Sequence, residues 1–179
     1  MFNDYVTRIG VLLAEGEIEV DTLILHGQST AWLCYDASRN AKLEEYFEKF
    51  LSLSNMIDSA HVNFHYGDET MIDMHGSVKG GKFVIGQQAY SLVVIPQLKN
   101  LSGSVCERLK EFVAQGGTVL AVKNSVEDVP YLLEGKVNPE LDALLKQFTW
   151  FDSEDDLTAA IGEYTKLQPV VVAGAIRWL

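Results

Sequence analysis

Residues 90–122, YSLVVIPQLKNLSGSVCERLKEFVAQGGTVLAV, contain the pattern that decides the fold of this chain. A short apolar run is followed by a helical segment, and the pair Gly116-Gly117 separates this helix from a second apolar run. Strand, helix and strand in that order form a βαβ unit, in which a right-handed crossover joins two parallel strands. The stretch therefore predicts a parallel β-sheet.

The same alternation of strands and helices continues on both sides of this unit. Strands are expected at residues 20–26, 61–66, 92–95, 118–122 and 170–173, and helices at residues 2–15, 40–60, 68–75, 102–115, 128–133, 139–148 and 153–164. Residues 27–39 are expected to form a loop, and Trp150 and Phe151 to form a short strand or to pack on the sheet. Gly80-Gly81 predicts a β-hairpin insertion near residues 77–90. This order of elements predicts a three-layer, doubly wound α/β protein with a parallel sheet, flavodoxin-like in size.

The charge and the apolar pattern exclude several classes of partner. The net charge of −11 argues against nucleic acid and anionic membranes, because both require clustered Lys and Arg. No apolar run approaches the ~20 residues of a membrane span, and no secretory signal is visible, so a cytoplasmic location is expected. The two cysteines, Cys34 and Cys106, are expected to be buried free thiols.

Ligands of open α/β sheets bind at the carboxyl ends of the strands, which directs attention to four loops. These loops are residues 26–36, 67–69, 97–101 and 123–128. The first of them contains Ser29 and Thr30, which suit a flavin phosphate, but Gly27 stands alone and Trp32 is bulky. The sequence therefore argues against flavin, and no cofactor is expected.

An amidotransferase would require a Cys on a tight strand-to-helix turn, activated by a His. The natural place follows residues 118–122, where the chain reads VKNSVED and has no Cys. Cys106 lies inside a helix, at the start of its apolar face, and Cys34 has no His nearby in the sequence. A small core residue is the favoured interpretation of Cys106.

Several polar residues near the second expected strand invite a metal hypothesis. His61, His65 and His75 flank the pair Asp68-Glu69, but their spacing matches no zinc signature. Asp68 is better explained as the N-cap of the following helix. No metal ion is expected, and an acid/base role for Asp68-Glu69 lacks a second carboxylate at a definable distance.

The candidate binding residues lie in the first two strand-end loops. Trp32 and Tyr35 could stack on a sugar ring, although packing against a neighbouring domain is favoured. The candidates are Ser29, Trp32, Tyr35, Asp36, Asp68 and Glu69, with no catalytic residue among them.

Three stretches of the sequence resemble a known family. These are residues 2–36, FNDYVTRIGVLLAEGEIEVDTLILHGQSTAWLCYD, residues 63–102, NFHYGDETMIDMHGSVKGGKFVIGQQAYSLVVIPQLKNLS, and residues 109–122, LKEFVAQGGTVLAV. They look like the accessory α/β domain that follows the catalytic barrel in large bacterial glycoside hydrolases of the α-L-rhamnosidase type. The chain is also similar to the trimerisation domain of certain β-galactosidases, a class I glutamine-amidotransferase-like fold without the nucleophile. The most specific part is Asp68-Glu69, followed by the Gly-Gly hairpin and the VVIP strand, and one departure is His26-Gly27-Gln28, where relatives tend to have His-Pro.

The resemblance implies a domain organisation and a function. Residues 1–16 would be a helix leading out of a preceding domain, residues 17–173 a single α/β domain, and residues 174–179 the start of a following segment. The expected function is that of a non-catalytic accessory domain of a glycoside hydrolase, which contacts neighbouring domains or mediates homo-oligomerisation. Two alternatives stay open: a sugar- or small-molecule-binding module that uses the strand-end loops, and a free-standing flavodoxin- or amidotransferase-like enzyme.

Overall fold

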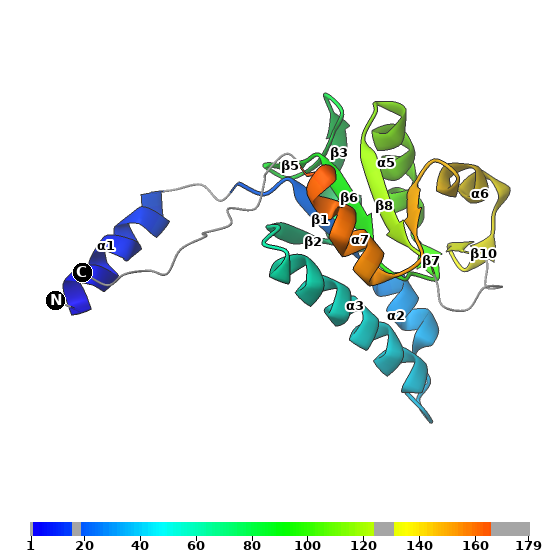
Figure 1. Ribbon diagram of the computed structural model, residues 1–179. Coiled ribbons are helices and arrows are strands. Elements are labelled where there is room, and N and C mark those ends of the chain that lie inside the picture. The colour runs from blue at the N-terminus through cyan, green and yellow to red at the C-terminus, as the bar shows by residue number, and fades with distance from the viewer. Residues whose placement is uncertain (1, 16–18, 124–130, 166–179) are drawn as a thin grey trace.

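A computed structural model of the chain describes residues 2–15, 19–123 and 131–165. Within these residues the central sheet has five strands, all parallel, in the order β11-β8-β6-β1-β2 (Figure 1). The strands are β1 (Thr22–His26), β2 (Phe64–Asp68), β6 (Leu92–Ile95), β8 (Thr118–Val122) and β11 (Thr149–Phe151). The prediction of a parallel α/β sheet is thereby confirmed, and the expected strand at residues 170–173 lies outside the described residues.

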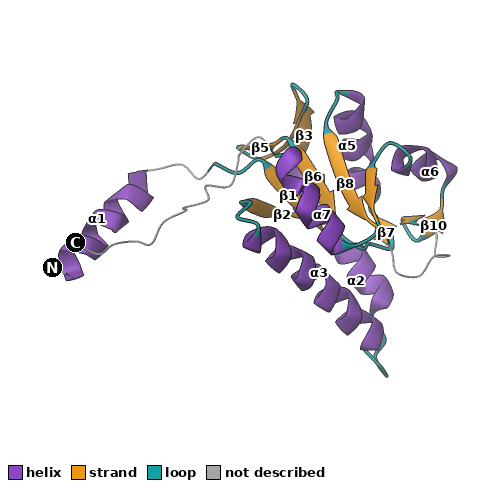
Figure 2. Cartoon of the chain, in the orientation of Figure 1, coloured by secondary structure: helices purple, strands orange, loops and turns teal. Residues whose placement is uncertain are grey.

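Helices cover both faces of this sheet (Figure 2). Because successive side chains of a strand point to opposite faces, Leu23 and Leu25 of β1 pack on one face and Ile24 on the other. One face carries α3 (Ala41–Ser59) and α7 (Glu154–Ala160), and the other carries α5 (Gly103–Ala114). The three-layer arrangement follows from these two apolar clusters.

In the sequence, an antiparallel sheet is inserted between the parallel strands β2 and β6. It consists of β3 (Gly76–Lys79), β4 (Lys82–Ile85) and β5 (Gln88–Tyr90), and it contacts α4 (Glu69–His75) and α5. Gly80 and Gly81 have φ values of 59° and 72° and connect β3 to β4, as a two-residue hairpin requires. The expected hairpin is confirmed, and β5 extends it by a strand that was not foreseen.

The structure corrects several expected elements. Residues 27–39 are not all loop, because α2 (Gln28–Cys34) lies within them. The second strand starts at Phe64 and not at His61, since His61 adopts a left-handed φ of 59° immediately after the C-cap of α3. Residues 128–133 were expected to be helical, but their described part contains β9 (Leu132–Leu133). This strand pairs with β7 (Asn100–Leu101) and β10 (Lys136–Val137) in a small sheet.

The remaining helices agree with expectation. They are α1 (Phe2–Glu15), α6 (Pro139–Leu145) and α7, which continues into a 3₁₀ turn, η1 (Ile161–Glu163). Trp150 lies in β11, which settles its expected position on the sheet. Among the described residues, no helix has both the length and the apolar character that a membrane crossing demands.

Candidate functional site

The order of the strands places one natural site on the sheet. From β1 the chain moves to β2 on one side, and then returns across β1 to β6, β8 and β11 on the other. The connections after β1 and β6 therefore lead in opposite directions, and the carboxyl ends of these two strands form a topological switch point. The residues that follow β1, β2 and β6 meet at this edge.

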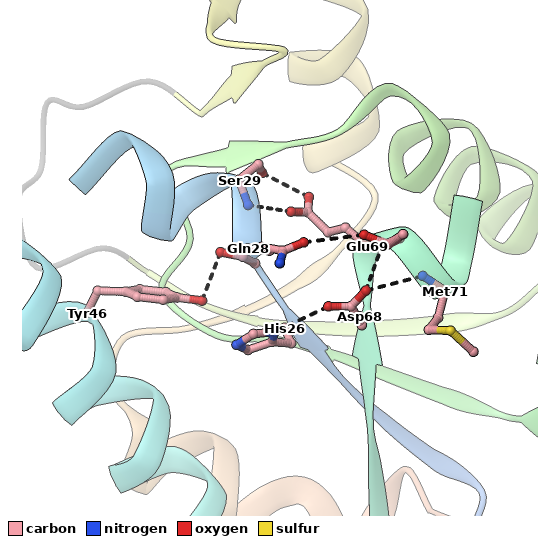
Figure 3. Close-up of polar contacts among 9 residues, drawn as sticks. His26, Gln28, Ser29, Tyr46, Asp68, Glu69 and Met71 are labelled. Atoms are coloured by element: carbon pink, nitrogen blue, oxygen red, sulfur yellow. Dashed lines mark hydrogen bonds and ion pairs between the residues drawn. The ribbon is translucent and has the colours of Figure 1, made fainter. Parts of the chain in front are cut away.

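Glu69 occupies the centre of the switch point. Its carboxylate is buried and accepts hydrogen bonds from the Ser29 backbone N–H at 2.6 Å and from the Ser29 hydroxyl at 2.9 Å (Figure 3). It also accepts a hydrogen bond from the Ser102 backbone N–H at 3.1 Å. One side chain thus joins the connection after β2 to the connections after β1 and β6.

These donors are the groups that would otherwise bind an anionic ligand. Ser29 is the second residue of α2, and Ser102 is the N-cap of α5. Backbone N–H groups at the start of a helix are unpaired within the helix and attract negative charge. In this protein the Glu69 carboxylate takes that position, so a flavin phosphate would have to displace it.

Asp68 has a different role from its neighbour. One carboxylate oxygen, Oδ1, accepts hydrogen bonds from the backbone N–H groups of Thr70 at 2.9 Å and Met71 at 3.2 Å (Figure 3). The expected N-cap at Asp68 is confirmed. The other oxygen, Oδ2, lies 3.8 Å from His26 Nδ1, and the His26 ring packs edge-on against Phe50.

A second set of hydrogen bonds fixes the connection after β6. The buried Thr30 hydroxyl accepts from the backbone N–H groups of Lys99 at 3.1 Å and Asn100 at 3.0 Å, and it donates to the Asn100 carbonyl at 3.2 Å. The Asn100 side-chain oxygen accepts from the Gly135 N–H at 2.8 Å, and the Glu134 carboxylate accepts from the Gly103 N–H. The chain after β9 is therefore held against the same edge.

A groove of about 560 Å³ opens over Glu69, and we call it the switch-point groove. Its lining comprises Gln28, Ser29, Trp32, Leu33, Glu69, Thr70, Asp73, Asn100, Ser102, Ser104, Glu134 and Gly135. Of the six predicted binding residues, the groove brings together Ser29, Trp32 and Glu69.

Tyr35 and Asp36 lie elsewhere. They line a separate groove at the far end of α2, of about 680 Å³. The Asp36 carboxylate accepts hydrogen bonds from the hydroxyl and the backbone N–H of Ser38, and these bonds lower the pKa of Asp36. Asp36 therefore closes a local turn.

Sequence reasoning missed several polar residues of the switch-point groove, among them Gln28, Asp73, Ser104 and Glu134. Asp73 follows Glu69 by four residues, a spacing that places both on one face of α4, so helical periodicity could have found it. Gln28 and Ser104 adjoin residues that were considered, within the first loop and at the start of the 102–115 helix. For Glu134 no local pattern was available, because its position depends on the pairing of β9 with β7.

The residues of the metal hypothesis serve other purposes. His65 Nδ1 lies 3.0 Å from the Tyr90 hydroxyl, and Asp68 caps α4. In the described part of the chain, no three His, Cys, Asp or Glu side chains come together as metal ligands would.

Both cysteines are buried free thiols, as expected. Cys106 lies on the buried face of α5, and burial raises the pKa of its thiol. Since the thiolate is the nucleophilic form, this environment disfavours a nucleophilic role for Cys106.

In comparisons with known proteins, no family model matches the sequence, and no curated protein matches it. The function is therefore inferred from the geometry of the site together with the sequence resemblance.

Proposed function

We propose that this chain is a non-catalytic accessory domain of a multidomain glycoside hydrolase. The observation that carries the proposal is the position of the Glu69 carboxylate at the switch point. In doubly wound proteins this position receives the ligand or the cofactor. In this chain it is filled from within, by a side chain that connects three strand-end segments, and such a contact stabilises the fold.

The fold we infer is flavodoxin-like, or class I glutamine-amidotransferase-like. Counted along the chain, the parallel strands lie in the order 2-1-3-4-5, which is the order of flavodoxin-like sheets. The glycoside hydrolase origin rests on the sequence resemblance, whose most specific part is Asp68-Glu69. The hydrogen bonds of this pair support a structural reason for the motif, because Asp68 begins α4 and Glu69 joins it to α2 and α5.

The surface that we propose for contact with a preceding domain is the apolar face of α1. Phe2, Tyr5, Val6 and Ile9 lie on one side of this helix, and their side chains are 77%, 51%, 50% and 36% exposed. A helix with an uncovered apolar stripe is typical of a segment that packs on a partner. The occupant would be the domain from which residues 1–16 lead.

A first experiment tests the absence of catalysis. The purified chain would be incubated with nitrophenyl α-L-rhamnoside, with nitrophenyl β-D-galactoside and with glutamine. We expect no release of nitrophenolate or ammonia above the blank. Sugar release that survives repurification would overturn the proposal.

A second experiment tests the domain contact. Cys34 and Cys106 are buried, so a cysteine introduced as Tyr5→Cys would be the accessible thiol among the described positions. Thr7→Cys is the matched control, because residues two positions apart in an α-helix, such as Tyr5 and Thr7, point to nearly opposite sides. A maleimide should label both variants of the isolated chain, and in a polypeptide that includes the preceding domain it should label Thr7→Cys alone. Equal labelling of both in the longer polypeptide would contradict the contact.

A further inference from the structure

The switch-point groove has the size of a small-molecule site although its floor is closed. Its volume of about 560 Å³ falls within the roughly 300–1,000 Å³ of typical ligand pockets. The floor is the buried Glu69 carboxylate, whose hydrogen bonds to Ser29 and Ser102 leave the space above it open. The groove therefore offers a place for a ligand that does not use the N–H groups of the helix starts.

One wall of this groove is an exposed indole. Trp32 is 70% exposed, the highest value among the large apolar side chains of the α/β layers. It stands on α2, a short helix that the hydrogen bonds of Thr30 join to the connection after β6. A flat aromatic ring that is exposed to water is well suited to stack on an apolar face of a ligand.

The charges of the groove exclude one class of ligand. Asp73 and Glu134 are exposed carboxylates on its rim, and no Lys or Arg is among its lining residues. Within the residues that the structure describes, neither carboxylate pairs with a basic side chain. Phosphates, nucleotides and acidic sugars would meet negative charge there that no basic side chain neutralises.

The uncharged groups of the groove distinguish between two remaining classes of ligand, organic cations and neutral sugars. The Gln28 side-chain oxygen accepts from the Thr70 hydroxyl at 3.4 Å, which leaves the Gln28 amide group as a donor. Ser104 adds a hydroxyl, and the two carboxylates are acceptors. An organic cation would need acceptors alone, whereas sugar hydroxyls both donate and accept.

We propose that the switch-point groove binds a neutral pyranose. The ring stacks on Trp32, and its hydroxyls donate to Asp73 and Glu134 and accept from Gln28. This binding site is independent of the proposed accessory role, because it uses no residue of α1 and requires no catalysis.

The test is a titration of the intact chain with three neutral probes: methyl β-D-galactopyranoside, methyl α-L-rhamnopyranoside and methyl β-D-glucopyranoside. Binding would be measured by saturation-transfer NMR and calorimetry. We expect at least one probe to saturate, with a Kd on the order of 1–10 mM, as suits a small open site. Tetramethylammonium chloride and inorganic phosphate serve as the cationic and anionic comparisons, and neither should bind.

Two variants identify the groove as the location. Trp32→Ala should weaken sugar binding by about tenfold or more, because the stacking surface is lost. Tyr35→Ala is the matched control: its ring is also exposed, it follows α2 directly, and it lines the other groove. Binding by Tyr35→Ala should equal that of the native chain, and both variants should fold because both side chains lie in solvent.

Three results would overturn the proposal. They are no saturation by any of the pyranosides up to about 100 mM, unchanged sugar binding by Trp32→Ala, and binding of tetramethylammonium in preference to the sugars. None of these results bears on the labelling of α1, so a failure of the sugar site is distinguishable from a failure of the accessory role.

Discussion

Glu69 and Ser29 are forty residues apart in the sequence and are joined by two hydrogen bonds, of 2.6 Å from the Ser29 N–H and 2.9 Å from its hydroxyl. A third donor, the Ser102 N–H, completes the surroundings of the carboxylate. A buried carboxylate is costly unless such donors compensate it, and hydrogen bonds to a charged group are stronger than neutral ones. The start of α4 is therefore joined to two other helix starts through one side chain.

Replacement of this side chain should destabilise the protein strongly. In Glu69→Ala the N–H groups of Ser29 and Ser102 lose their acceptor, so we expect the free energy of unfolding to fall by about 2–4 kcal/mol. Urea unfolding at neutral pH measures this change. Asp73→Ala, on the same helix but exposed, is the control and should lie within about 0.5 kcal/mol of the native chain. Equal stability of the two variants would show that Glu69 does not join the connections.

The space left in Glu69→Ala should accept a small carboxylate. Formate or acetate can approach the freed N–H groups of Ser29 and Ser102, and a ligand that binds only the folded state stabilises it by mass action. We expect added formate to raise the urea midpoint of Glu69→Ala more than an equal concentration of chloride does. The native chain should respond equally to the two salts, because its own carboxylate fills the position. An equal response by the variant would contradict this account.

The hydroxyl of Thr30 should contribute more to the stability of the fold than its methyl group does. Thr30→Val retains the shape of the side chain and removes the oxygen that Lys99 and Asn100 contact. The buried N–H group of Asn100 and the partly buried N–H group of Lys99 then lack their acceptor, and the free energy of unfolding should fall by about 2–3 kcal/mol. Thr30→Ser keeps the oxygen and should cost about 1 kcal/mol. A larger loss in the Ser variant than in the Val variant would assign the effect to packing.

The sheet was predictable from the sequence because its signals are local. Buried parallel strands appear as short apolar runs, and a glycine pair marks the end of α5. Gly116 shows the reach of such reasoning, since its φ of 85° suits the end of α5 as expected. Gly117 shows its limit, because a Cβ at this residue would collide with the ring of Phe112, a tertiary reason that no local pattern reveals.

The site was predictable only in part, for the same reason. Asp68 caps its own helix, and a cap is recognised from adjacent residues. The hydrogen-bond partners of Glu69 lie 40 and 33 residues away in the sequence. The sequence therefore identified Glu69 as a candidate site residue but did not predict that it joins three connections. The segment that forms α2 reads as a loop because Ser and Thr compete with helical hydrogen bonds, yet the Thr30 hydroxyl joins that helix to the connection after β6.

The hairpin between β3 and β4 allows a test of backbone conformation alone. Gly80 has a φ of 59°, and a Cβ there would meet no atom within 4 Å, so a substitution affects only the backbone preference. Gly80→Ala should lower the free energy of unfolding by about 1 kcal/mol, because an L-residue is disfavoured in the left-handed region. Gly80→Asn should cost less, since Asn adopts this region more readily. Urea unfolding of the two variants measures the difference, and equal losses would contradict the turn type.

Alkaline pH should destabilise the fold through its buried tyrosines. Burial raises the pKa of Tyr46, of Tyr90 and of Tyr131 above the ordinary value, and it raises the pKa of Cys106 as well. The folded state therefore holds protons that the unfolded chain releases. Stability is fully present below the unfolded pKa values, at about pH 9–10, and declines as the pH rises above them toward the folded values.

Tyr46 can be separated from the other groups by Tyr46→Phe. Its hydroxyl donates to the Gly27 carbonyl at 3.1 Å, so the variant should lose about 1 kcal/mol of stability at neutral pH. Above pH 10 the variant should lose stability less steeply than the native chain, because one group that resists ionisation in the folded state has been removed. Urea unfolding at intervals from pH 7 to about pH 11 gives both quantities. Parallel curves over the whole range would show that Tyr46 does not contribute to the alkaline loss, and that its hydrogen bond to Gly27 acts on stability alone.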